Sequence, residues 1–140
     1  MDNDNKPTKF CYPYPHAAIT ADCIVYGYDP NKTLRVLLVK RRNEPYKDCW
    51  AFPGGFMEID EDLKTCARRE VMEETGMALG EVFQCRSYSA VDRDPRERVI
   101  TVVHFAFEAL AEVKGSDDAA EAQWFDIDNL PVLAFDHRTI

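Results

Sequence analysis

The sequence is short of positive charge, of paired cysteines and of long apolar runs. It carries 17 lysines and arginines against 25 aspartates and glutamates, which gives a formal net charge of −8. Because nucleic-acid backbones are bound by basic surfaces, this balance argues against a general nucleic-acid partner. A small phosphorylated ligand stays open, since it needs only a few arginines and a metal ion can supply further positive charge.

The cysteines are five in number and widely spaced, and none forms a C-x-x-C pair that would indicate a zinc site: Cys11, Cys23, Cys49, Cys66 and Cys85. We interpret them as reduced thiols of a cytoplasmic protein. The first residues, MDNDNKPTK, lack the basic and then apolar order of a signal peptide. No apolar run is long enough to cross a membrane, so no membrane partner is expected.

A length of 140 residues predicts one domain that is large enough to bury a core without disulfides. The polar start, Met1 to Lys9, is expected to be mobile, and Phe10 to Pro15 follows as an extended arm of aromatic residues and prolines. Its rings either cover an edge of the core or form a wall for a base. We therefore expect an arm over residues 1–15 and a single domain over residues 16–140, with no second domain.

Strand patterns are rich in β-branched and aromatic residues and are separated by turn residues. Ala18–Tyr28 and Leu34–Val39 are predicted to form a hairpin, because Asp29-Pro30-Asn31 between them supplies a turn. An acidic turn is expected over Gly115–Ala120. Further strands are predicted at residues 50–52, 81–90, 99–109 and 123–125.

One helix is expected from about Asp62 to Thr75, because apolar residues recur there at four-residue spacing: Leu63, Ala67 and Val71. This stripe should face the core. Near the end of the chain, Asp128 is expected to cap a helical turn, and a last helix is predicted to begin near Phe135.

The predicted helix also carries an acidic cluster that the rules of helix stability disfavour. Glu70 shares a face with Glu73 and Glu74, so like charges repel at close spacing. The cluster also lies in the last turns before Gly76, where the helix dipole favours cations. A hard divalent cation bound by carboxylate oxygens would relieve both faults, and such violations often mark function.

A longer pattern runs through this helix and the loop before it, and it resembles the Nudix box of hydrolases that cleave nucleoside diphosphates linked to another moiety. The matching residues are Gly55, Glu61, Arg69, Glu70, Val71, Glu73, Glu74, Gly76 and Met77. The order of strands and helices also resembles the Nudix fold. The resemblance implies an α/β (α+β) fold class, with a mixed β-sheet sandwiched between α-helices.

The resemblance also implies roles for individual residues. Glu61 and Arg69 would form an orienting salt bridge along the helix. One or more Mg²⁺ (or Mn²⁺) ions would be held by the carbonyl of Gly54 and by the carboxylates of Glu70, Glu73 and Glu74. Magnesium keeps several waters and bridges to phosphate oxygens, so an incomplete protein cage suits it.

The implied reaction is attack by water on a phosphorus of the pyrophosphate link, with a carboxylate as general base. Glu70 and Glu74 are the favoured bases, and Glu97 and Glu121 outside the box are alternatives. Metal ions would neutralise the charge on the phosphoryl oxygens.

Substrate residues are expected among the arginines that follow predicted strands or lie in the charged loop at residues 92–98. These are Arg41, Arg42, Arg96 and Arg98, which can bind phosphates or a terminal ribose. The segments at residues 15–17, 92–96 and 133–137 make the chain similar to the ADP-ribose pyrophosphatase subgroup. That subgroup cuts ADP-ribose to AMP and ribose 5-phosphate.

Two other functions use the same features. A housecleaning hydrolase of nucleoside triphosphates would need the same metal-binding face. A nucleotide-sensing Nudix module would bind its ligand without turnover, although such modules tend to lose glutamates of the box, which are all present here. A homodimer is possible, as in relatives.

Overall fold

The computed structural model describes residues 10–113, 115 and 119–140. Two predictions concern residues outside these ranges. They are the mobility of Met1–Lys9 and the centre of the acidic turn at Gly115–Ala120. Within them, no helix is long and apolar enough to span a membrane. All five cysteines are free, as expected.

Seven strands form a mixed sheet in the order β3-β2-β1-β6-β5, with β4 paired to β1 and β7 to β2. The pairing of β1 with β6 is parallel, and the other strand pairs of the described chain are antiparallel. The bounds are β1 Ala18–Tyr28, β2 Leu34–Arg41, β3 Trp50–Ala51, β4 Gly54–Phe56, α1 Leu63–Thr75, β5 Phe83–Tyr88, β6 Val99–Phe107 and β7 Ala119–Asp126.

The predicted strands are confirmed with small shifts of their ends. β1 and β2 form the expected hairpin, and the turn is held by Asp29 Oδ1, which accepts from the backbone N–H groups of Asn31 at 2.9 Å and Thr33 at 3.0 Å. β7 is longer than predicted, because it pairs with almost all of β2. The three-residue strand β4 was not predicted, because two of its residues are glycines and it shows no strand-like sequence pattern.

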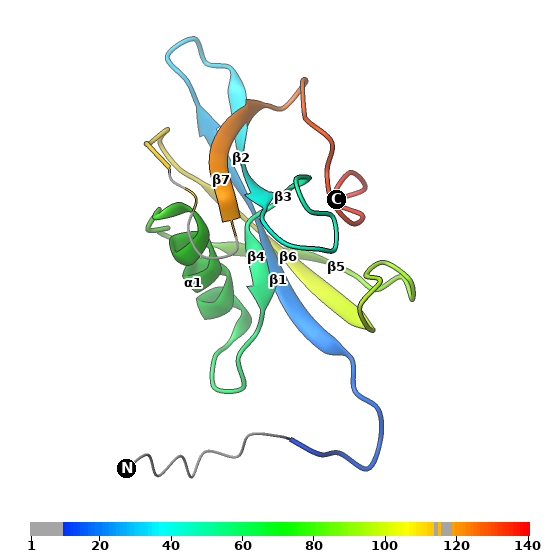
Figure 1. Cartoon of the computed structure of the whole chain (residues 1–140). Coiled ribbons are helices and arrows are strands. Elements are labelled where there is room, and N and C mark those ends of the chain that lie inside the picture. The colour runs from blue at the N-terminus through cyan, green and yellow to red at the C-terminus, as the bar shows by residue number, and fades with distance from the viewer. Residues whose placement is uncertain (1–9, 114, 116–118) are drawn as a thin grey trace, which may run out of the picture.

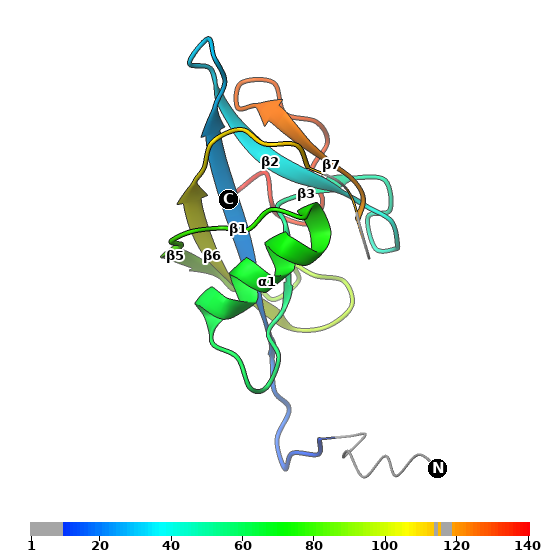
Figure 2. The ribbon, with the colours of Figure 1, turned by 90° about the vertical axis from the view of Figure 1, so that its left-hand side faces the viewer.

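The two faces of the sheet are covered by different kinds of structure (Figures 1 and 2). Helix α1 lies on one face, and the C-terminal segment after β7 lies on the other. Under α1 the core contains Ala21, Cys23, Val25, Leu37, Cys66, Ala67, Val71, Met77, Val82 and Ala106. On the opposite face Val36, Leu38 and Phe52 pack with partly buried side chains that include Trp50, Phe125, Leu130, Leu133 and Ile140.

Helix α1 begins and ends as its sequence predicts. Asp62 caps its start by accepting from Thr65 N at 2.8 Å, which satisfies a backbone N–H of the first turn. Gly76 ends it with φ 75°, and its N–H donates to Met72 O at 2.9 Å. The apolar stripe faces the core, where Ala67 and Val71 are fully buried.

The prediction that a last helix begins near Phe135 is wrong. The described part of the chain has α1 as its α-helix, and residues 135–139 form turns. Phe135 has φ 50°, a left-handed conformation that interrupts a right-handed helix. Asp128 is not a cap either, because residues 129–131 form no helical turn. Its N–H donates to Asp126 Oδ1 at 2.9 Å, which makes Asp126 the turn-forming side chain.

The described part of the N-terminal arm, Phe10–Pro15, extends away from the sheet (Figure 1). Phe10, Tyr12 and Tyr14 are each more than half exposed, so the interpretation that these rings cover an edge of the core is wrong. Tyr12 stacks instead on His16 of the arm's own base, with ring centroids 3.9 Å apart.

We expect Gly76→Ala to lower the free energy of unfolding by about 1 kcal/mol, because an L side chain disfavours the left-handed backbone that ends α1. Space is not limiting, since an added Cβ would meet nothing within 4 Å. Gly80→Ala is the matched control, with a nearest contact of 3.7 Å and no positive φ. Urea unfolding of both variants checks the prediction, and an equal loss in both would contradict it.

Candidate active site

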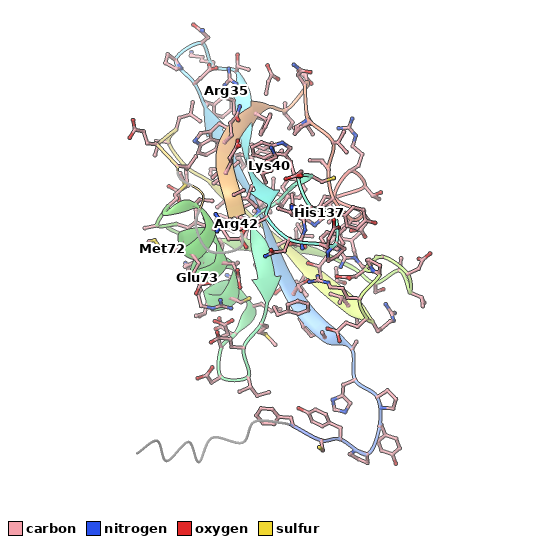
Figure 3. All side chains as sticks on the ribbon, in the orientation of Figure 1. Arg35, Lys40, Arg42, Met72, Glu73 and His137 are labelled. Carbon is pink, nitrogen blue, oxygen red and sulfur yellow. The ribbon has the colours of Figure 1, made fainter. Side chains whose placement is uncertain are left out.

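A cavity of about 570 Å³ lies where β1, β4, α1 and the C-terminal segment meet. The lining draws on segments that are far apart in the sequence, from Thr20 in β1 to His137 near the end of the chain. Figure 3 shows Glu73 on α1 and His137 on the C-terminal segment, on opposite sides of β4. The charged side chains that line the cavity therefore come from several elements that only the fold brings together.

The glycines of β4 allow carboxylates to approach the strand closely. Gly54 lies opposite Asp22 of β1, and an added Cβ there would overlap the carbonyl of Ala21 and the Asp22 carboxylate. A Cβ on Gly55 would lie 2.5 Å from the carboxylate of Glu70. Both positions therefore require glycine for the close approach of neighbouring groups, which is the physical reason for the pair.

Arg69 organises the carboxylates on its side of the cavity. Its Nη2 and Nε donate to Glu61 at 2.6 Å and 2.9 Å, so the predicted salt bridge is confirmed. Its Nη1 donates to Glu70 at 2.8 Å and to Glu73 at 3.2 Å. Hydrogen bonding from Arg69 lowers the pKa of Glu61 to about 2, and Glu61 in turn raises the pKa of Arg69. Both stay charged across the range of ordinary pH.

Glu70 and Glu74 form a hydrogen-bonded carboxyl pair, and both pKa values are raised. Burial is the largest cause for each. Glu74 is shifted further, because it is more deeply buried and is repelled by Glu70 and Asp22, while the backbone of Gly54 offsets part of the shift. The Glu70 shift is reduced by its contact with Arg69. Burial and mutual repulsion therefore disfavour the ionised forms of these two carboxyl groups.

Asp22 and His137 are site residues that sequence reasoning missed. Asp22 is buried in β1, and its Oδ2 accepts from Thr101 at 2.6 Å and lies 3.7 Å from His137 Nε2. His137 Nδ1 accepts from the backbone N–H of Phe52 at 3.0 Å, so the ring lies between β1 and the segment that joins β3 to β4. Burial lowers the pKa of His137, which makes the neutral ring the resident form. The signal for Asp22 was a carboxylate inside an otherwise apolar strand.

The predicted substrate arginines separate into two groups. Arg41 and Arg96 line the cavity, where both lie over Phe135 with Cζ at 4.9 Å and 5.5 Å from the ring centroid. Arg42 and Arg98 are not among the lining residues. Arg42 donates to Ala119 O at 3.2 Å and Arg98 donates to Ala90 O at 3.2 Å. Their proposed contacts with substrate stay predictions.

The alternative bases and the aromatic arm also lie outside the cavity lining. Glu121 in β7 is 3.9 Å from Lys40 Nζ, and Glu97 is exposed in the loop after β5. The arm at Phe10–Pro15 contributes no lining residue either. Glu70 and Glu74 are therefore the candidate bases that face the cavity.

The donor set suits a hard divalent cation. Glu70 and Glu74 present carboxylate oxygens that neighbouring charges and burial make unfavourable without a counter-ion. Among the described residues, no group of three or more acidic, histidine or cysteine side chains is already placed so that it could hold a metal ion by itself. Glu73, which is paired with Arg69, is the most exposed of the glutamates that Arg69 contacts. Such an incomplete set fits magnesium or manganese, which retain waters and bind phosphate oxygens.

Comparison with protein families gives a match of the NUDIX domain model over residues 17–140. The ADP-ribose pyrophosphatase of Methanocaldococcus jannaschii is 43% identical over 127 residues, which cover 91% of this chain and 72% of that protein. The ADPR responsive transcriptional repressor NtrR of Acinetobacter baylyi is 33% identical over 132 residues. This match covers 91% of this chain and about half, 52%, of the repressor.

Solved structures show the same fold. The NUDIX domain of Shewanella oneidensis NrtR complexed with ADP ribose superposes with a TM-score of 0.84 at 27% identity, covering 90% of this chain and 84% of that one. A bifunctional NMN adenylyltransferase/ADP ribose pyrophosphatase from Francisella tularensis, complexed with AMP and a manganese ion, has a TM-score of 0.76 at 28% identity. The match covers 91% of this chain and 40% of that one.

Without divalent cations, we expect Glu74→Gln to melt at a higher temperature than the wild type at about pH 7. The raised pKa means that native Glu74 keeps its proton where the unfolded chain has lost it. Stability therefore falls as the pH rises above the ordinary value of 4.5, and the variant loses this slope. Added Mg²⁺ should stabilise the wild type and have less effect on the variant.

Thermal melts in EDTA and in Mg²⁺, taken between about pH 5 and pH 8, measure this slope. Glu81→Gln serves as control, because Glu81 is exposed and outside the cavity lining. An unchanged pH slope in Glu74→Gln, or the same change in Glu81→Gln, would refute the assignment.

Proposed function

The chain belongs to the NUDIX family, and from this premise we propose that it hydrolyses the pyrophosphate bond of a nucleoside diphosphate linked to another moiety. ADP-ribose is the substrate that we propose, with AMP and ribose 5-phosphate as products. The observation that carries the proposal is the Glu70–Glu74 pair, oriented by Arg69 beside a cavity that also contains arginines. Similarity to the archaeal ADP-ribose pyrophosphatase supports the choice of substrate.

Glu70 and Glu74, with the carbonyl of Gly54 and with Glu73, would hold Mg²⁺ or Mn²⁺. When bound, the cation neutralises charge on the diphosphate and makes its phosphorus easier to attack. Arg69 orients Glu70 and Glu73 through its Nη1, and Glu61 keeps the guanidinium in place. The nearly buried carboxylate pair is therefore unfavourable in the free protein, and binding of the substrate and the cation would stabilise it.

In the proposed reaction a water oxygen forms a bond to phosphorus, and the bridging P–O bond breaks. The proton of that water goes to Glu70 or Glu74, because these are the candidate bases that face the cavity. Arg41 and Arg96 would bind the substrate on the side of the cavity formed by Phe135. Their positive charge suits the phosphates or the ribose hydroxyls.

Two other functions make different predictions. A nucleoside triphosphate pyrophosphohydrolase would release pyrophosphate from a triphosphate and leave ADP-ribose intact. A sensing module, suggested by the similarity to the NtrR repressor, would bind ADP-ribose without cleaving it. The intact Glu61–Arg69 bridge and the paired glutamates favour catalysis over sensing.

A substrate panel with Mg²⁺ tests the proposal. It compares ADP-ribose, NADH, diadenosine polyphosphates and nucleoside triphosphates, with the products resolved by chromatography. We expect AMP and ribose 5-phosphate from ADP-ribose at the highest kcat/KM. Pyrophosphate release from a triphosphate at higher kcat/KM would replace the proposal by the first alternative, and binding of ADP-ribose without turnover would replace it by the second.

Substitution of the paired glutamates should separate the base from its alternatives. We expect Glu70→Gln and Glu74→Gln to lower kcat by about 100-fold or more, because each removes a cavity carboxylate that binds the cation or takes the proton. Glu97→Gln and Glu121→Gln are measured beside them under the same conditions. A comparable loss in either of these, with full activity in Glu70→Gln and Glu74→Gln, would move the base outside the helix.

A further inference from the structure

Two arginines of the loop between β5 and β6 reach the cavity, and each is held side-on by one carboxylate. Arg93 donates from Nε and Nη2 to Asp136 of the C-terminal segment at 2.9 Å and 2.7 Å. Arg96 donates from Nε and Nη2 to Asp94 at 3.0 Å and 2.7 Å. Both arginines line the cavity, and Arg93 was not among the substrate residues predicted from the sequence.

The side-on contact leaves the end of each guanidinium group unused. Within the described chain, Nη1 of Arg93 and Nη1 of Arg96 have no hydrogen-bond partner among the contacts formed. Nη1 and the second N–H of Nη2 together form an end-on fork, which matches two oxygens of a phosphate. The Arg93 side chain is only 3% exposed. Arg93 lines the cavity, so this unused donor is available to a ligand there.

Both guanidinium groups are also held in place before any ligand arrives. Arg96 lies over Phe56 and Phe135, with Cζ at 5.1 Å and 5.5 Å from the ring centroids. Arg93 is fixed by burial and by Asp136. Because little side-chain freedom remains to be lost on binding, these arginines are pre-organised for an anion.

The position of this pair separates it from the acidic part of the cavity. In the view of Figure 1, the loop and the C-terminal segment lie on one side of β4, and α1, the helix to which Glu70 and Glu74 belong, lies on the other. An anion at the arginines would therefore accept hydrogen bonds from N–H donors that do not depend on a cation at Glu70 and Glu74. Arg69, by contrast, is occupied by Glu61, Glu70 and Glu73 and has no similar fork to offer.

We infer that Arg93 and Arg96 form an anion subsite that binds a phosphate group of the substrate or product without a divalent cation. The inference deepens the proposed function and rests on it, because the phosphate would belong to one half of the cleaved diphosphate. AMP and ribose 5-phosphate share this phosphate chemistry. The subsite makes the C-terminal segment part of the binding site, since Asp136 orients Arg93.

Isothermal titration in EDTA tests the subsite, with AMP, ribose 5-phosphate and inorganic phosphate as separate ligands. We expect the wild type to bind AMP or ribose 5-phosphate, and the tighter ligand identifies the half that occupies the subsite. Arg93→Lys and Arg96→Met should each weaken that binding by about tenfold or more, because a charged fork is lost. Arg86→Met removes the same charge from exposed β5 and should leave the affinity unchanged.

Thermal melts show whether each variant is folded. If buried Arg93→Lys does not fold, the more exposed Arg96→Met, with 40% side-chain exposure, decides alone. Absence of binding in EDTA, unchanged affinity in folded Arg93→Lys or Arg96→Met, or equal weakening in Arg86→Met would overturn the subsite. Failure of the proposed function is seen separately, as wild-type protein that does not cleave ADP-ribose with Mg²⁺.

Discussion

The ion pair between Arg69 and Glu61 is the interaction on which the acidic side of the cavity depends. One guanidinium group binds Glu61 through two nitrogens, and its third nitrogen contacts Glu70 and Glu73. Without it, the carboxylates of α1 would repel each other with no fixed orientation. Glu61 belongs to the loop before the helix, so the same contact also joins the loop to the helix.

The cavity has acidic side chains on one side of the short strand β4 and arginines on the other. On the α1 side, burial and mutual repulsion raise the pKa values of Glu70 and Glu74, which favours a cation. On the other side, Arg93 and Arg96 are neutralised by one carboxylate each and retain unused donors. A diphosphate compound that carries its own negative charge and recruits a cation complements both sides at once.

The elements that the sequence predicts well are those governed by local rules. Asp62 and Gly76 bound α1 through capping, and the Asp29 turn closes the β1–β2 hairpin. The prediction of a helix at Phe135 failed because no local signal shows that this segment is held by strand β3. There Trp50 exchanges backbone hydrogen bonds with Val132 and Ala134, at 3.0 Å and 2.7 Å.

The sequence by itself determined the acidic chemistry, because the spacing from Gly55 to Gly76 brings carboxylates together within one loop and one helix. Only the tertiary structure decided which residues complete the cavity. Asp22 and His137 meet across 115 positions of chain, and Arg93 meets Asp136 across 43. Helical periodicity relates residues three or four positions apart, whereas these contacts arise from strand pairing and from the packing of the C-terminal segment, which no local pattern encodes.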